Sequence, residues 1–167
     1  MCILSADVWN RLTIPKHRFI LWLTMLDRLK TKERLHKVGI TPDDLCPICF
    51  TQVEKINHLF FTCEFSKQCR QLLMNWLGVH LNRTTITGLL KGVQRHSRGK
   101  SKKAIIFTII ARLVYNIGKA RNAAVWSAKV PTVQATVACI KAEVKGRVHN
   151  LLSKKSSSSD LNWFNGL

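Results

Sequence analysis

The chain has 167 residues, of which 46% are hydrophobic, so it can bury the core of one ordinary domain and is not disordered throughout. Lys and Arg number 27 against 9 acidic residues, which gives a formal net charge of +18 at pH 7. Such an excess makes a compact chain repel itself, and a polyanionic partner relieves that repulsion. Nucleic acid is the first candidate partner and an anionic membrane surface is the second. A charge that only keeps the chain soluble is the third interpretation.

Membrane insertion and secretion are both disfavoured. The strongest apolar run, residues 104–111, ends at Arg112 and is well short of the roughly 20 residues that a membrane span needs. Residues 1–7 lack the basic start and the long apolar stretch of a secretory signal. We therefore expect an intracellular protein, in which closely spaced cysteines favour a metal over disulfides. The basic stretch at residues 100–103 is compatible with residence in the nucleus.

The first helix is expected to begin at Pro15, because proline suits the first helical position. Large apolar residues then recur at steps of three and four, which predicts a buried face made of Phe19, Trp22, Leu23, Leu26 and Leu29. Thr31 is expected to cap a second, shorter helix that ends near Gly39. This helix leads into the cysteine segment.

Beyond the cysteine segment, the same periodicity predicts an amphipathic helix that ends near Gly78, a short helix over residues 86–93 and long helices over residues 104–126 and 131–148. The fold class is therefore mainly α: a small helical domain around a metal, with at most a short β-hairpin, followed by long C-terminal helices. The expected divisions are a zinc-binding domain (1–94), a basic linker (95–103), a helical region (104–152) and a disordered tail (153–167).

Four potential metal ligands form the pattern C-x2-C-x8-H-x4-C: Cys46, Cys49, His58 and Cys63. Zinc prefers thiolate sulfur and imidazole nitrogen, four at a time in a tetrahedron. The short spacing of the first two cysteines allows a tight turn that directs both sulfurs to one point. The eight residues between Cys49 and His58 allow a hairpin that brings His58 back to the same ion. The sequence therefore predicts one Zn²⁺ ion bound by these four residues.

Four protein ligands close the coordination sphere and leave no position for an activated water, so this zinc is expected to be structural. The alternative is a chance coincidence of buried cysteines with a core histidine. Cys69 lies just beyond Cys63 and could compete as a ligand, although a core thiol is the favoured interpretation. Cys2 and Cys139 have no neighbours at ligand spacing and are expected to be free thiols.

A set of apolar, charged and metal-ligating residues around this motif forms a wider pattern. It comprises Trp9, Ile14-Pro15-Lys16, Phe19, Leu21-Trp22, Asp27-Arg28-Leu29, Thr31, Arg34-Leu35, Gly39-Ile40, Cys46-Pro47-Ile48-Cys49, Glu54, His58-Leu59-Phe60-Phe61, Cys63 and Phe65-Ser66. In this pattern the chain resembles the reverse transcriptase zinc-binding domain, which lies downstream of the polymerase in plant LINE-type (non-LTR) retrotransposons. The resemblance implies the same four metal ligands. It also implies a parent polyprotein that nicks DNA and copies its RNA there.

The chain departs from that family at two places. Cys69-Arg70 stands where the family usually has a tryptophan just past the final cysteine. Residues 115–122 resemble the helical Trp-x-x-Arg-Asn segment of the family, with Gly118 in place of the aromatic residue and Arg121-Asn122 kept. Both departures concern packing in the second half of the chain and not the metal ligands.

We expect no catalysis from this chain. A polymerase needs carboxylates on a strand turn to hold two magnesium ions. The only adjacent pair, Asp43-Asp44, follows a proline, leads directly into the zinc turn and has no third acid at a useful distance. A cluster of acids suited to ribonuclease H chemistry, a glycine-rich phosphate loop and a Ser-His-Asp arrangement are also missing from the sequence.

The leading functional hypothesis is a module that binds RNA or single-stranded DNA, with zinc fixing the geometry of the first half. Its phosphate contacts are expected from Arg95, Arg98, Lys100, Lys102, Lys103, Arg112 and Lys119. Such binding is mostly electrostatic and only weakly sequence-specific, and a solvated face is the alternative role for these cations. The competing hypotheses are a protein-interaction scaffold and an inactive retroelement relic. Neither a membrane nor a small-molecule substrate is an expected partner.

Overall fold

The computed structural model describes residues 9–81, 83–97, 99–152 and 158–167. The helices are α2 (Pro15–Met25), α3 (Lys32–Lys37), η1 (His58–Thr62), α4 (Glu64–Trp76), α5 (Ile86–His96), α6 (Lys100–Ser127), α7 (Val133–Leu152) and α8 (Ser158–Asn165). In these ranges the only β-type pairing is an isolated antiparallel bridge between Leu45 and Val53. The predicted fold class, mainly α with long C-terminal helices, is confirmed.

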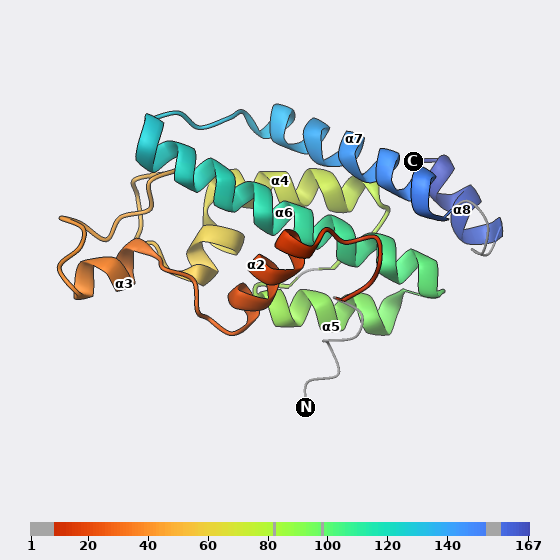
Figure 1. Cartoon of the computed structure of the whole chain (residues 1–167), viewed down its shortest axis with the longest axis horizontal. Coiled ribbons are helices and arrows are strands. Elements are labelled where there is room, and N and C mark those ends of the chain that lie inside the picture. The colour runs from red at the N-terminus through yellow and green to blue at the C-terminus, as the bar shows by residue number, and fades with distance from the viewer. Residues whose placement is uncertain (1–8, 82, 98, 153–157) are drawn as a thin grey trace.

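Helix α6 runs through the middle of the molecule, with α2, α4, α5 and α7 packed around it (Figure 1). Residues 105–114 of α6 are all buried, so this helix is covered on every side and forms the centre of the core. Helix α7 contacts both α6 and α4, which joins the segment after the cysteines to the C-terminal helices. None of the described helices combines the length and apolar character that crossing a bilayer requires.

Helix α2 packs on α6 through a different face from the one that its apolar periodicity predicts. The buried residues of α2 are His17, Leu21 and Thr24. By contrast, Phe19, Trp22 and Leu26 are 49%, 38% and 43% exposed, so the prediction that they are buried was wrong. Both sets follow helical spacing, and the packing of α2 on α6 buries only one of them. Just before α2, the hydroxyls of Thr13 and Thr108 are hydrogen-bonded across 2.9 Å, which ties the approach to this helix to α6.

The turn between α5 and α6 is shorter than the expected basic linker of residues 95–103. Helix α5 continues to His96 and α6 begins at Lys100, so residues at both ends of that stretch are helical. Gly99, at the N-cap of α6, has a φ of 86°, a left-handed conformation that glycine adopts without strain. The chain therefore reverses over a very short turn, and α5 packs directly on α6.

Part of the segment expected to be a disordered tail is ordered. Residues 158–165 form α8, and Phe164 is buried with 4% exposure. The indole Nε1 of Trp76 donates to the carbonyl of Leu167 over 2.8 Å, which fixes this end against α4. The low-complexity residues 153–157 lie outside the described residues. Aromatic packing by Trp163 and Phe164, with Phe164 against Trp76, holds α8 on the rest of the fold.

Candidate metal centre

The first two cysteines lie in one tight turn. The amide of Cys46 donates to the carbonyl of Gln52, and the amide of Phe50 donates back to the carbonyl of Cys46, each over 2.8 Å. Phe50 has a φ of 57°, which lets the chain reverse directly after Cys49. The backbone N–H groups of Ile48 and Cys49 donate to the sulfur of Cys46. This turn directs the sulfurs of both cysteines to the same side.

His58 and Cys63 lie at the two ends of one π-helical turn, η1. The amide of Cys63 donates to the carbonyl of His58 over 2.8 Å, which closes the wider ring of a five-residue step. The H-x4-C spacing of the motif therefore corresponds to one π turn. Cys63 then directly precedes α4, and the backbone N–H groups of Phe65 and Ser66 donate to its sulfur.

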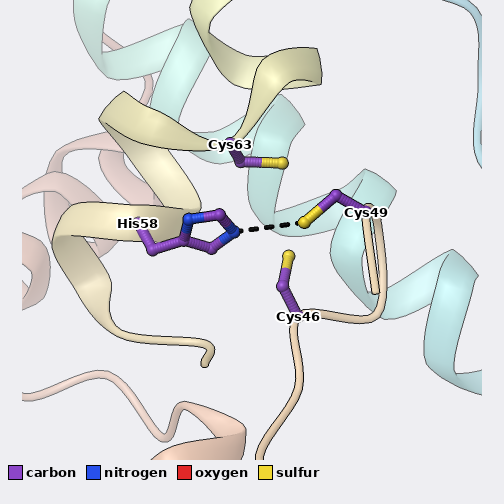
Figure 2. A group of neighbouring side chains, drawn as sticks. All are labelled: Cys46, Cys49, His58 and Cys63. Atoms are coloured by element: carbon purple, nitrogen blue, oxygen red, sulfur yellow. Dashed lines mark hydrogen bonds between the residues drawn. The ribbon is translucent and has the colours of Figure 1, made fainter. Parts of the chain in front are cut away.

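All four predicted ligands converge on one point. Their potential ligand atoms, three Sγ atoms and one imidazole nitrogen, lie within 4.8 Å of one another. Figure 2 shows the side chains of Cys46, Cys49, His58 and Cys63 pointing toward a common centre from the turn on one side and from η1 and the start of α4 on the other. The Sγ of Cys49 lies 3.3 Å from the Nε2 of His58. Such convergence of four donors is the geometry that a tetrahedral ion requires.

The environment of His58 favours the neutral imidazole that a metal requires. Burial lowers the pKa of His58, so the uncharged ring is stabilised in the folded chain. Its Nδ1 lies 3.0 Å from the Oγ1 of Thr62. When Nδ1 carries the proton, it donates to Thr62, and Nε2 keeps a free lone pair that faces the sulfurs. Thr62 therefore orients the ligand, a role that the spacing of the motif does not reveal.

The thiols of Cys46 and Cys63 form a buried hydrogen-bonded pair. The pKa of Cys46 is raised by its hydrogen bond to Cys63 and by burial. The same hydrogen bond lowers the pKa of Cys63, which accepts it as the thiolate. These opposite shifts reflect two sulfurs close together in a buried site, where a divalent cation would stabilise both as thiolates.

Among the described residues, Cys69 and Cys139 are not part of the cluster. Cys69 is fully buried in the core, and burial raises the pKa of its thiol to about 11, which suits a neutral core residue. Cys139 is exposed, and Cys2 lies outside the described residues.

Three sulfurs and one imidazole in a mostly buried site fit one zinc ion with a closed coordination sphere, which gives the ion a structural role. The predicted cofactor is confirmed by this donor set.

A buried carboxylate ties the zinc segment to the central helix. Glu54 is 0% exposed, and its Oε1 and Oε2 accept from Nε and a terminal nitrogen of Arg121 at 2.8 and 3.0 Å. The same carboxylate accepts from the backbone amide of Lys32, at the start of α3, over 2.6 Å. Glu54 thus connects three elements that are far apart in sequence. Glu54 belongs to the sequence pattern that resembles the zinc-binding family, but that pattern does not indicate its partner, Arg121.

Four of the predicted phosphate-binding residues flank the turn between α5 and α6: Arg95, Lys100, Lys102 and Lys103, which we call the basic turn. Arg95 and Lys100 are exposed, whereas Lys102 and Lys103 are half-buried. The ammonium of Lys102 lies 4.3 Å from the ring centroid of Trp163. The first turn of α6 contains no acidic residue. Arg98 lies outside the described residues.

The last two predicted phosphate-binding residues lie elsewhere on α6. At the helical rise per residue, Lys119 is roughly 24 Å along the axis from Lys103, so it cannot share one phosphate with the basic turn. Lys119 is exposed. Arg112 differs from the expectation of a surface contact, because it is only 3% exposed and its guanidinium donates to Glu143. The central position of α6 explains this burial.

The described fold and cluster define a small helical zinc-binding module. Residues 3–69 match the family model described as zinc-binding in reverse transcriptase. The matched region contains all four ligands and ends at Cys69, so this part of the chain is similar to the zinc-binding domain of reverse transcriptases. None of the curated proteins and none of the solved structures compared with the chain matches it.

Proposed function

We propose that this chain is a zinc-organised module that binds RNA or single-stranded DNA through basic residues and carries no catalytic activity of its own. The observation that carries the proposal is the basic turn, where three lysines lie at the N-terminus of the longest described helix and Arg95 lies near the end of the helix before it. The formal net charge of +18 and the similarity of residues 3–69 to a zinc-binding region of reverse transcriptases support it.

The start of α6 combines two sources of positive potential. The first N–H groups of a helix lack partners within it, and the helix dipole adds a partial positive charge there. Lys100, Lys102 and Lys103 add full charges to the same end, and no side chain caps it. A phosphate placed there pairs with the cations and with the free N–H groups. Binding of this kind depends on charge and on salt more than on base sequence.

Filter binding of the zinc-loaded chain to RNA and to single-stranded DNA tests the proposal. We expect tight binding at low salt and a steep loss as salt rises. In the variant Lys100→Gln/Lys103→Gln, the slope of log K against log salt should fall by about 1.4, since each phosphate contact on a single strand adds about 0.7. The control Lys30→Gln/Lys129→Gln removes the same charge from exposed lysines away from the turn. Absence of affinity at low salt refutes the proposal.

The exposed face of α2 favours a second candidate function, a protein-interaction scaffold. Phe19, Trp22 and Leu26 leave large apolar side chains in solvent, and the rings of Phe19 and Trp22 lie 5.9 Å apart. Grouped exposed aromatic residues are typical of protein interfaces. A pull-down that recovers a protein partner after nuclease treatment, and loses it with Phe19→Ser/Trp22→Ser, supports this function. Recovery that depends on nucleic acid supports the first.

An origin in a plant LINE-type retrotransposon belongs to the same proposal, as does residence in the nucleus. The resemblance of the cysteine segment and of Arg121-Asn122 to that family supports the origin. A reverse transcriptase reading frame upstream of the coding sequence is the expected genomic context. A reading frame interrupted in related genomes favours the inactive relic instead, and microscopy of the tagged chain tests the nuclear location.

A further inference from the structure

A pocket of about 430 Å³ lies between α2, α6 and α7, away from both the zinc ligands and the basic turn. This volume lies within the range of about 300–1,000 Å³ that is typical of small-ligand sites. Its basic lining residues come from all three helices: Lys16 and His17 from α2, Arg112 and Lys119 from α6, and Arg147 from α7. The one acidic residue in the lining is Glu143.

Two buried side chains of this pocket have nitrogen atoms without a partner. His17 is 2% exposed, and its Nδ1 has no hydrogen-bond partner among the described residues. Arg112 is 3% exposed, and its Nε also lacks a partner there. A buried polar atom without a partner is unfavourable and is rare in folded proteins. Two of them in the lining of one pocket indicate a ligand that accepts hydrogen bonds.

The electrostatics of the pocket select an anion. Glu143 accepts from Arg112, which leaves the charges of Lys16, Lys119 and Arg147 without a compensating carboxylate in the lining. Burial and the four nearby cations lower the pKa of His17 to about 4, so this ring is neutral at pH 7. The same cations that repel a proton on His17 attract a negative ligand.

The cations are held in place before any ligand binds. The guanidinium of Arg147 donates to the carbonyls of Leu12 and Arg11, which fixes it across the start of α2. The ring of Tyr115 stacks on His17 with 4.1 Å between centroids, and the ammonium of Lys16 lies 5.0 Å from the centroid of Tyr115. Such pre-ordering lowers the entropy that binding must overcome.

We propose that this pocket binds a phosphate group, with Lys16, Lys119 and Arg147 surrounding the anion and Arg112 and His17 donating from its floor. The planar, multiple donors of arginine suit phosphate oxygens, and charge-assisted hydrogen bonds are the strongest that side chains form. The source of the phosphate is a nucleic-acid strand, and this choice of source rests on the proposed function. The pocket gives the chain a second phosphate contact, separate from the basic turn.

Calorimetric titration of the zinc-loaded full chain with inorganic phosphate and with pyrophosphate tests the pocket. The variant Lys16→Gln/Lys119→Gln changes two exposed lysines, so it retains the fold. We expect it to lose about tenfold or more in affinity for pyrophosphate. The control Lys91→Gln/Lys129→Gln removes the same charge outside the pocket and should bind as the unmodified chain does. Equal affinities for the two variants overturn the proposal.

An NMR titration of His17 provides a second readout of the pocket. An anion in the pocket offsets the surrounding cations, so saturating pyrophosphate should raise the pKa of His17 above its value in the free protein. The same titration of Lys16→Gln/Lys119→Gln serves as the reference, and the change in the pKa of His17 should be reduced or lost in that variant. An unchanged pKa of His17 at saturation shows that the anion binds elsewhere and refutes the proposal.

Oligonucleotides distinguish the source of the phosphate. If the pocket takes the end of a strand, a 5′-phosphorylated single strand should lose affinity in Lys16→Gln/Lys119→Gln, whereas the same strand without its terminal phosphate should not. Loss with both strands identifies an internal phosphodiester. If pyrophosphate binds in the pocket but neither strand binds at low salt, the proposed function fails and the phosphate site stands. If both strands bind, but Lys16→Gln/Lys119→Gln binds pyrophosphate and the strands as well as the control variant does, the proposed function stands and the phosphate site fails.

Discussion

Two regions of the molecule are stabilised by different kinds of interaction: the turn with the first two zinc ligands, and the middle of α6. In residues 45–57 only Cys46, Pro47 and Glu54 are buried, and Phe50 is 67% exposed. In residues 105–114 of α6 every side chain is buried. The first region lacks an apolar core of its own and depends on ligands and one carboxylate, whereas the second depends on packing. One small domain can thus contain a part that folds with a metal and a part that folds without it.

Loss of zinc should separate the two regions most strongly. In His58→Ala or Cys49→Ser the site loses a ligand, and a closed zinc site contributes about 10–16 kcal/mol of apparent binding energy in isolated peptides. We expect loss of the metal by elemental analysis and loss of hydrogen-exchange protection over residues 45–63, with protection of α6 retained. The control Cys139→Ser changes an exposed cysteine and should keep one zinc per chain. Unchanged metal content in His58→Ala contradicts the ligand assignment.

A cavity in the core should destabilise the region around α6. Phe107 is 0% exposed, so Phe107→Ala should lower the free energy of unfolding by about 3–5 kcal/mol. Denaturant titration measures the change, and the folded variant should still bind zinc. Phe19→Ala removes the same atoms from a side chain that is 49% exposed and should lower stability by about 1 kcal/mol or less. Equal effects of the two substitutions contradict the described packing of α6.

The contact between Glu54 and Arg121 should link the two regions. Arg121→Ala leaves the buried carboxylate with only the amide of Lys32, and we expect a loss of about 3 kcal/mol in unfolding free energy. Zinc affinity should fall with it, because the zinc segment loses its anchor on α6. A double-mutant cycle with Glu54→Gln isolates the pair energy. A cycle without coupling indicates that the zinc segment is held independently of α6.

The buried His17 makes the core region sensitive to acid. Its pKa of about 4 lies below the ordinary value of 6.5, so the unfolded chain binds the proton more readily in this window. Stability should therefore fall as pH drops from 6.5 toward 4, by about 2 kcal/mol at pH 5. Denaturant titration from pH 7 to 5 gives the difference in unfolding free energy between the unmodified chain and His17→Gln, which separates the contribution of His17 from that of zinc release. A difference that stays constant with pH contradicts this contribution.

The smallest expected effect is a gain at Gly118. No atom lies within 4 Å of a Cβ built there, and glycine within a helix is less favourable than alanine by about 1 kcal/mol. Gly118→Ala should therefore raise the thermal midpoint of unfolding. Gly92→Ala provides the contrast, because its Cβ would lie 3.3 Å from the side chain of Leu81 and the gain should be lost. Destabilisation by Gly118→Ala contradicts the open space at this position.

The zinc ligands could be predicted from the sequence because each ligand pair is set by local geometry. Cys46 and Cys49 lie in one tight turn, and His58 and Cys63 lie at the two ends of one π turn. The buried face of α2 could not be predicted in this way. That helix carries two stripes with helical spacing, and periodicity gives the spacing of a stripe but not the surface that it meets.

Local spacing by itself determined the mainly helical class, the approximate extents of the long helices and the four metal ligands, because backbone hydrogen bonds and short turns depend on neighbouring residues. Only the tertiary structure decided that Arg112 is buried, that Glu54 binds Arg121 and that basic residues of three helices share one pocket. These contacts join residues that are distant in sequence. The packing of α2 and α7 on α6 brings them together, and no local pattern specifies that packing.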